Sequence, residues 1–200
     1  MDLIVIIDYG MGNLRSVEKA LEKASRQVMV SHNQGDVRAA DAIVLPGVGA
    51  FGDAMVRLKR LGLDAAIKEE VTAGKPFLGI CLGLALLFEE SDEHGVHEGL
   101  GLLPGRVELL PTNLKIPHIG WNRVSVQKES RLFDGVPNGS FFYFVHSYAV
   151  VPKIDSDVLC RTEYGCEFAS GVERDNIAAV QFHPEKSSSL GLRMLENFVS

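Results

Sequence analysis

The chain has 200 residues, of which 46% are hydrophobic, and a formal net charge of −6 from 20 Lys and Arg against 26 Asp and Glu. This size and composition are typical of one globular domain with a sizeable core. The acidic balance and the scattered basic residues argue against nucleic-acid binding as the main role.

Cysteine usage and targeting signals indicate the compartment. No apolar run approaches the length of a membrane span, and the N-terminus lacks the basic region and cleavage site of a signal peptide. Cys81, Cys160 and Cys166 are an odd number of cysteines at spacings that match no zinc site or disulfide framework. We therefore expect a soluble protein that works in the reducing cytoplasm and holds no metal ion.

The first half of the chain alternates apolar runs with helical patterns. A continuous apolar strand at 3–7 is followed by a Gly-rich turn and by a helix that Asn13 is placed to cap. Further strands and helices are predicted at 28–31, 42–45, 50–61 and 64–73. Strands and helices that alternate at this spacing form a parallel sheet with right-handed crossovers, and such sheets bind ligands at the carboxyl ends of their strands.

The turn after the first strand contains Gly10-Met11-Gly12, which begins like a dinucleotide-binding loop. The third glycine of that pattern is missing, because Ser16 and Val17 stand where it should be. We therefore expect no nucleotide cofactor at this turn.

The stretch 74–83 places a cysteine at the end of a buried strand. An apolar run opened by Gly-Lys-Pro indicates the strand, and apolar residues recur at helical spacing over 84–88. Cys81 therefore sits on the turn between strand and helix, where Gly79 and Gly83 relieve the crowding of a sharp bend. Such a turn exposes the thiol, and a helix N-terminus stabilises negative charge. We interpret Cys81 as a nucleophile; the alternative, a small buried apolar residue, leaves both glycines unexplained.

After Gly99 the pattern changes to short β runs separated by turns. Strands are predicted at 106–110, 121–127, 141–145, 157–163 and 177–182, and a last helix at 188–199. No linker, low-complexity segment or internal repeat interrupts the chain. We therefore predict one α/β domain over residues 1–200, whose second half extends the sheet.

A cysteine nucleophile needs a base within hydrogen-bond reach and a third group that orients the base. His183 ends an apolar strand and is followed two residues later by Glu185, and extended backbone would direct both side chains to one side. Of the other histidines, His32, His94 and His97 are predicted in solvated polar loops, His118 in a turn, and His146 at a strand end that no acid follows. We therefore predict His183 as the base and Glu185 as its partner.

Three motifs resemble those of the class I (triad) glutamine amidotransferases, namely Gly79-Ile80-Cys81-Leu82-Gly83, Pro46-Gly47-Val48-Gly49 and the run from Phe182 to Ser187. Further stretches at 8–13, 117–122 and 143–148 resemble the glutaminase subunits of imidazole glycerol phosphate synthases, which are enzymes of histidine biosynthesis. The resemblance runs nearly end to end. It implies a flavodoxin-like α/β fold, with a central, mostly parallel sheet flanked by helices and extra β elements in the second half.

The resemblance implies a glutaminase that releases ammonia through a thioester on Cys81 and uses no cofactor. His183 would handle the thiol proton and later activate water, while Glu185 would hold and stabilise the imidazole. The tetrahedral oxyanion would meet the backbone N–H groups of Leu82 and Gly49. Backbone donors of this kind typically contribute ~3–4 kcal/mol each.

The remaining substrate contacts follow from the same resemblance. Gly47 and Gly49 make the 46–49 loop flexible, which suggests that partner binding switches activity by flipping a peptide there. Glu93 would pair with the α-ammonium group, although the run Ser-Asp-Glu also suits an ordinary solvated acid. The rest of the amino-acid end of glutamine would be bound by the backbone around His146, Ser147 and Tyr148.

One departure from the family pattern concerns substrate affinity. The family usually has Met-Gln after the cysteine turn, whereas this chain has Leu84-Ala85, and that glutamine side chain normally touches the substrate. Losing a hydrogen bond to a charged group costs roughly 1.5–3 kcal/mol. We therefore predict weak glutamine binding, with the nucleophile and the base intact.

The resemblance also implies a protein partner. This would be a (β/α)₈-barrel cyclase subunit, bound as a heterodimer, that consumes the ammonia while it forms imidazole glycerol phosphate. Aromatic residues are enriched in interfaces, although core packing is the alternative for Trp121. The predicted interface residues are Asn13, Trp121, Asn122 and Tyr143.

Three rival interpretations remain open from the sequence. The chain could serve another synthase, such as one for pyridoxal phosphate or anthranilate, but the stretches at 117–122 and 143–148 speak against this. It could be a regulatory subunit that has lost glutamine, which the alanine at 85 keeps open. It could also be a thiol peptidase of related architecture, which would need no partner.

Overall fold

Five parallel strands form the centre of the main sheet in the computed structural model, which describes residues 2–24 and 27–200. In spatial order they are β2 (Gln27–Ser31), β1 (Leu3–Ile7), β3 (Ala42–Gly47), β4 (Phe77–Cys81) and β14 (Ile177–Val180). Because helices cover both faces, these strands are near-continuous apolar runs rather than alternating ones. Cys81 ends the strand between β3 and β14 and lies in register with Gly47.

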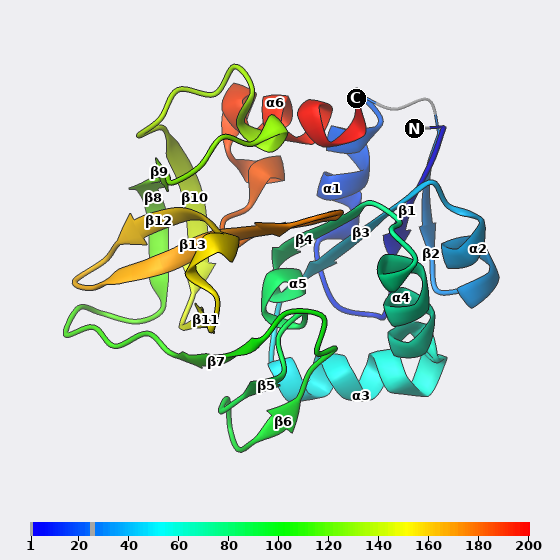
Figure 1. Ribbon diagram of the computed structural model, residues 1–200, viewed down its shortest axis with the longest axis horizontal. Helices are drawn as coiled ribbons and strands as arrows, with labels where there is room; N and C mark the ends of the chain where they lie inside the picture. Colours follow the sequence, from blue (N-terminus) through cyan, green and yellow to red (C-terminus); the bar gives the residue numbers. More distant parts are fainter. Residues whose placement is uncertain (1, 25–26) are drawn as a thin grey trace.

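Helices pack on both faces of this parallel centre (Figure 1). One face carries α1 (Leu14–Leu21) and α6 (Ser188–Val199), and the other carries α2 (Gln34–Ala39), α3 (Phe51–Leu61) and α4 (Leu63–Thr72). Side chains of β1 alternate between the two resulting cores. Ile4 and Ile6 join the core under α1 and α6, whereas Val5 and Ile7 join the core under the other three helices.

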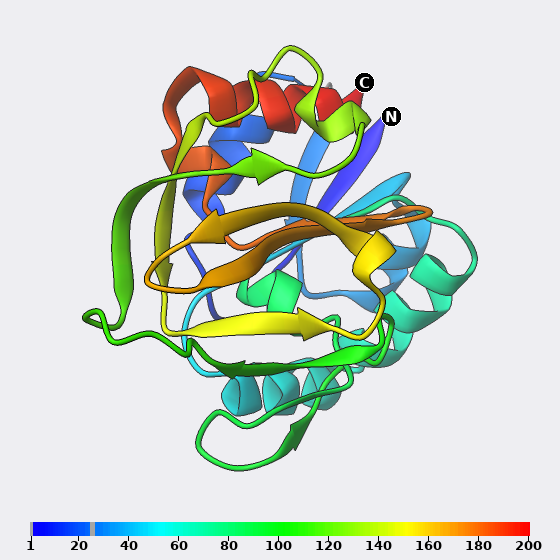
Figure 2. The same ribbon diagram turned by 60° about the vertical axis from the view of Figure 1, so that its left-hand side comes forward.

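Antiparallel strands extend the sheet beyond β14 (Figure 2). In spatial order they are β13 (Glu167–Arg174), β11 (Tyr148–Pro152), β7 (Gly105–Leu109), β5 (Glu90–Ser91) and β6 (His97–Glu98), of which β5 runs parallel to β7. A branch from β13 adds β12 (Val158–Glu163) and β9 (Ser125–Val126). The prediction that the second half extends the sheet is confirmed for these strands.

Two strands of the second half stand apart from the main sheet, and for them that prediction is wrong. β8 (His118–Arg123) and β10 (Phe141–His146) pair only with each other, as an antiparallel ribbon. The chain changes sheets after His146, where it passes through Ser147 into β11. Alternation along β8 places His118 and Asn122 on one face of this β8–β10 ribbon and Trp121 on the opposite face.

The boundaries of several elements differ from those predicted. The strand expected at 121–127 is the second part of β8 followed by β9, with a break at Val124. Elements that the sequence did not predict are α2, β5, β6, β11 and β13, and three short 3₁₀ turns at Arg131–Phe133, Asp155–Asp157 and Pro184–Lys186. Asn13 precedes α1, but its side chain donates to Ser16 Oγ at 2.8 Å and caps no backbone N–H group. Within residues 2–24 and 27–200, no helix is both long and apolar enough to cross a membrane.

Candidate active site

Cys81 occupies a strained turn at the end of β4. Its φ of 56° and ψ of −108° lie outside the regions that L-residues prefer. A Cβ atom on Gly83 would lie 1.7 Å from the carbonyl oxygen of Leu45, and one on Gly79 would lie 2.9 Å from the Cβ of Ala179. Both glycines therefore permit a close approach that any side chain would block. Strain of this kind concentrates at functional sites.

The helix after the cysteine is much shorter than predicted. α5 spans only Leu82–Ala85. The apolar spacing that suggested a longer helix instead reflects the core, since Leu84, Leu87 and Phe88 are all fully buried. A single helical turn carries little macrodipole, so the predicted electrostatic support for the sulfur from this helix is small.

His183 and Glu185 form a buried pair. His183 Nδ1 lies 2.8 Å from Glu185 Oε1, and the two side chains are 3% and 1% exposed. The pair lies together as predicted, but the predicted reason, an extended backbone, is wrong. The backbone from Pro184 to Lys186 forms one 3₁₀ turn, which folds the carboxylate back onto the imidazole.

The charge state of His183 depends on both of its neighbours. Burial acts to lower the pKa of His183, but hydrogen bonding to Cys81 and Glu185 and their negative charge raise it to about 9. His183 Nε2 nevertheless has no hydrogen bond of standard geometry among the described residues. The thiol and the ring are thus close enough to interact without an aligned hydrogen bond, and catalytic hydrogen bonds are often loose before substrate binds.

A cavity of about 470 Å³ opens on Cys81. This volume lies within the range of small-molecule sites. Six of the predicted substrate-binding residues line it, namely Gly49, Leu82, Glu93, His146, Ser147 and Tyr148. Gly47 does not line it. A Cβ atom on Gly47 would lie 2.0 Å from the Tyr9 hydroxyl, so the glycine there permits packing beneath the loop.

Glu93 is held in place rather than freely solvated. Its Oε2 accepts a hydrogen bond from the backbone N–H of Phe51 at 2.7 Å. Phe51 is the first residue of α3, and a helix N-terminus stabilises a carboxylate. The half-buried carboxylate is therefore fixed in place at the wall of the cavity.

Tyr9 supports the 46–49 loop from below and was not singled out by the sequence analysis. Its buried hydroxyl donates to the carbonyl oxygen of Pro46 at 3.1 Å. Gly49 adopts a φ of 104°, which only glycine adopts without strain. Tyr9 thus anchors the first half of the loop, and the second half depends on a backbone conformation that suits glycine.

Gln181 is a second pocket residue that the sequence analysis missed. Its Nε2 lies 3.8 Å from Cys81 Sγ, which is also 3.9 Å from the carbonyl oxygen of Val145. Gln181 stands two positions before His183. The period of two that applies to extended chain could have placed both side chains on the same side.

His146 lines the cavity, but its ring is engaged elsewhere. Nδ1 lies 2.9 Å from the carbonyl oxygen of Tyr148, and Nε2 lies 3.0 Å from Nδ1 of His118. The prediction that His118 lies in a turn is wrong, because it opens β8 and is 3% exposed. His32 and His94 are exposed, as predicted, but His97 opens β6 and packs half-buried against Gly52.

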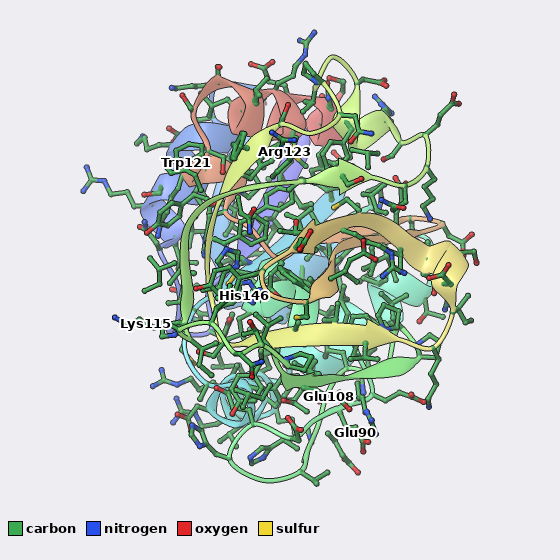
Figure 3. The ribbon with its side chains drawn as sticks, turned by 90° about the vertical axis from the view of Figure 1, so that its left-hand side faces the viewer. Glu90, Glu108, Lys115, Trp121, Arg123 and His146 are labelled. Carbon is green, nitrogen blue, oxygen red and sulfur yellow. The ribbon has the colours of Figure 1, made fainter. Side chains whose placement is uncertain are left out.

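Two of the predicted interface residues share the outer face of the β8–β10 ribbon. Trp121 is 52% exposed and contacts Tyr143 edge-to-face, with ring centroids 6.2 Å apart. Figure 3 shows Trp121 and Arg123 together on this side of the molecule. Asn122 instead points to the inner face, where it bonds to His118. Asn13 lies exposed before α1, and nothing in its contacts links it to the ribbon.

The other two cysteines lie outside the cavity. Burial raises the pKa of Cys160 to about 12, and Cys166 is a half-buried free thiol. Within the part of the chain that the structure describes, no group of three or more His, Cys, Asp or Glu side chains is placed to hold a metal ion.

Comparisons with known proteins show which family and which relatives this chain resembles in sequence. A family model described as "Glutamine amidotransferase class-I" matches residues 5–200. Imidazole glycerol phosphate synthase subunit HisH of Aquifex aeolicus is 58% identical over 195 residues, which cover 97% of this chain and 94% of the relative. The subunit of the same name from Moorella thermoacetica is 54% identical over 98% of this chain and 93% of the relative.

Solved structures resemble the fold at low sequence identity. A crystal structure of a glutamine amidotransferase superposes with a TM-score of 0.76 at 19% identity, covering 97% of this chain and 98% of that one. The structure of PurLQS from Thermotoga maritima contains a chain with a TM-score of 0.74 at 20% identity, and the match covers 98% of this chain and 97% of that one. These similarities concern the arrangement of helices and strands alone.

Proposed function

Because the chain belongs to the class I glutamine amidotransferase family, and relatives above 50% identity are synthase subunits, we propose that it is the glutaminase subunit of imidazole glycerol phosphate synthase. It hydrolyses glutamine to glutamate and ammonia for histidine biosynthesis. The observation that carries the chemistry is Cys81 on a strained turn, beside the buried pair of His183 and Glu185. The location in the cytoplasm and the single domain over residues 1–200 stay predictions.

The reaction follows from the placement of these three groups. His183 Nε2, a buried atom with no standard hydrogen bond among the described residues, holds the proton of the Cys81 thiol before the attack, since the pKa of the ring is raised to about 9. The resulting thiolate forms a bond to the side-chain amide carbon of glutamine. The imidazolium then gives that proton to the departing nitrogen, so ammonia leaves and a γ-glutamyl thioester remains. Water, deprotonated by His183, breaks the thioester and restores the thiol. Glu185 keeps Nδ1 protonated throughout and stabilises the imidazolium.

Substrate binding uses the walls of the cavity. The oxyanion is received by the backbone N–H groups of Leu82 and Gly49. Glu93 pairs with the α-ammonium group, since its carboxylate is already fixed by Phe51. The amino-acid end lies against the turn at 146–148, which faces the cavity on the side of Cys81.

The partner is a (β/α)₈-barrel cyclase that binds the outer face of the β8–β10 ribbon. The backbone N–H of His183 donates to the carbonyl oxygen of Tyr143 at 2.9 Å, so this ribbon contacts the catalytic histidine directly. Exposed Ile119, Trp121 and Phe141 give the face an apolar character with aromatic anchors. Docking there places the cyclase next to the site of ammonia release.

The proposed function is tested by measuring glutamate release from saturating glutamine. We expect low activity from the chain alone and strong stimulation when the barrel cyclase and its nucleotide substrate are added. Complex formation without activity in either state would show that the site is disabled and that binding is the remaining role. Failure to form the complex, or turnover of peptides by the isolated chain, would contradict the assignment.

Replacing Ala85 by glutamine is expected to lower the KM for glutamine by roughly tenfold or more, with little change in kcat. Ala85 lies half-buried in the wall of the cavity, so an amide there can supply the missing hydrogen bond, which is worth roughly 1.5–3 kcal/mol to a charged group. Initial rates of the complex over a range of glutamine concentrations measure the effect. Ala65→Gln, at an exposed position on α4, is the control. An unchanged KM in Ala85→Gln would show that the pocket has been rebuilt around alanine.

A further inference from the structure

A chain of hydrogen bonds crosses the inside of the β8–β10 ribbon and ends at the wall of the cavity. Tyr148 O lies 2.9 Å from His146 Nδ1, and His146 Nε2 lies 3.0 Å from His118 Nδ1. His118 Nε2 lies 3.2 Å from Asn122 Nδ2. His118 and His146 are directly opposite each other in the ladder of the ribbon, and Asn122 lies four residues further along the same face.

Chemistry allows only one arrangement of protons along this chain. A backbone carbonyl accepts only, so His146 Nδ1 carries the hydrogen and its Nε2 accepts. His118 must then donate from Nδ1 and accept at Nε2, where Asn122 supplies an N–H group. The Asn122 amide has a fixed orientation, because Nδ2 also donates to Glu163 O at 2.8 Å and Oδ1 accepts from Arg123 N at 2.7 Å. Both rings are thus held in the Nδ1–H tautomer.

The surroundings of the two rings keep them neutral and immobile. His118 is stacked between Tyr164 and Phe144, with ring centroids 4.0 Å and 4.9 Å away. Tyr164 is itself fixed by a hydrogen bond from its hydroxyl to Lys115 O at 2.7 Å. Burial lowers the pKa of both His118 and His146 to about 4, so neither ring is charged near pH 7. His146 is itself buried, with 8% of its surface exposed.

We propose that His118 and Asn122 are positioning residues of the glutamine site, which lock the His146 ring in one tautomer and thereby fix the turn at 146–148. The His146 ring fastens this turn from inside through the carbonyl of Tyr148, while Ser147 and Tyr148 line the cavity. Without the donor from His118, the buried Nε2 of His146 is left unpaired, and the ring leaves its position. The inference rests on the proposed function, since it deepens the account of the same site.

The tautomers can be observed without any assay of activity. In the full chain labelled with ¹⁵N-histidine, we expect two neutral Nδ1–H histidines at pH 7. A His146 variant should remove one of these signals, whereas His118→Phe should remove both, because it also releases the His146 ring. Asn122→Asp replaces the donor by an acceptor, so His118 should switch to Nε2–H and release His146. Detection of Nε2–H or charged rings at these positions in the unaltered chain would overturn the inference.

Affinity is measured in the Cys81→Ala background, where glutamine binds without turnover, in the complex with the cyclase. His118→Phe keeps the stacked ring but removes the donor, and we expect it to raise the dissociation constant for glutamine about tenfold. His118→Asn keeps an N–H donor in the same place, because the amide nitrogen of asparagine is bonded to Cγ, as Nδ1 is in histidine. We expect its dissociation constant for glutamine to lie within about threefold of the reference.

If His118 had only a structural role, the two variants would show the opposite order of glutamine affinity. His118→Asn loses the stacking contacts and should have the lower melting temperature of the two variants. If its glutamine affinity is also the lower, or if His118→Phe binds glutamine as well as the reference does, the positioning role is wrong. Absence of glutamine binding by the Cys81→Ala complex would instead contradict the proposed function, and the tautomer measurement would still decide the inference.

Discussion

Replacing Cys81 by alanine is expected to abolish glutamine-dependent synthesis, with a loss in kcat on the order of 10⁴-fold or more. Of the three cysteines, which all lie in the described part of the chain, Cys81 alone lines the cavity, since Cys160 is fully buried and Cys166 lies outside the cavity. Alanine tolerates the backbone of the turn as well as cysteine does, so the protein should remain folded. Glutamate release and the γ-glutamyl thioester, trapped by acid quench, measure the loss.

The control for this prediction separates chemistry from assembly. The Cys81→Ala complex should still form, and with added ammonium salt it should still make the cyclase product at the rate of the unaltered complex. Cys166→Ser, at a half-buried position outside the cavity, should retain glutamine-dependent activity. Residual thioester in Cys81→Ala, or loss of the ammonia-dependent reaction, would show that Cys81 has a different role.

The parallel centre of the fold could be predicted because its strands are buried on both faces. Such strands are short, continuous apolar runs, and β1, β3 and β4 stand out as such in the sequence. β13 was missed because small residues, Ser170 and Gly171, interrupt its apolar pattern although both are buried. α2 was missed because it has six residues, a glycine among them, and buries only Val37.

The site could be predicted in part, for a physical reason. Groups carried by one motif, such as His183 and Glu185, are close in space because they are close in sequence. Groups that only the pairing of distant strands brings together cannot be predicted in this way. The bond between His118 and His146 spans 28 residues and depends on the register of the β8–β10 ribbon, which neither strand reveals alone. Tyr9 likewise reaches the site only through the order of strands in the sheet.

The glycines around the active site are present for different structural reasons. Gly79 and Gly83 are required by close backbone contacts around the Cys81 turn, so their presence is explained by packing alone. Gly49 adopts a positive φ and has only the mobile end of Met11 near it. The glycine at 49 is therefore explained by its positive φ rather than by close backbone packing.

Replacing Glu185 by glutamine is expected to reduce kcat by about 10³-fold, because an amide neither fixes the Nδ1–H tautomer of His183 nor stabilises its positive charge. The pair is buried, with the carboxylate 1% exposed, so water cannot substitute for the lost charge. The KM for glutamine should change little, since the cavity wall does not include this residue. Glu98→Gln removes the same charge from an 86% exposed side chain and should leave the rate unchanged.

The pH profile of the same variant gives a second, independent result. The pKa of His183 is about 9, and Cys81 and Glu185 are what raise it against the effect of burial. Ammonia leaves only while the imidazolium can donate a proton. The pKa of about 9 belongs to the site without substrate, so kcat/KM of the unaltered complex, which reports the groups of the free enzyme, should fall as the pH rises through about 9. Glu185→Gln removes one of the two groups that raise the pKa of His183, so this alkaline limb of the pH profile should move to lower pH. If Glu185→Gln lowers kcat but leaves the limb in place, the carboxylate orients the ring without controlling its charge.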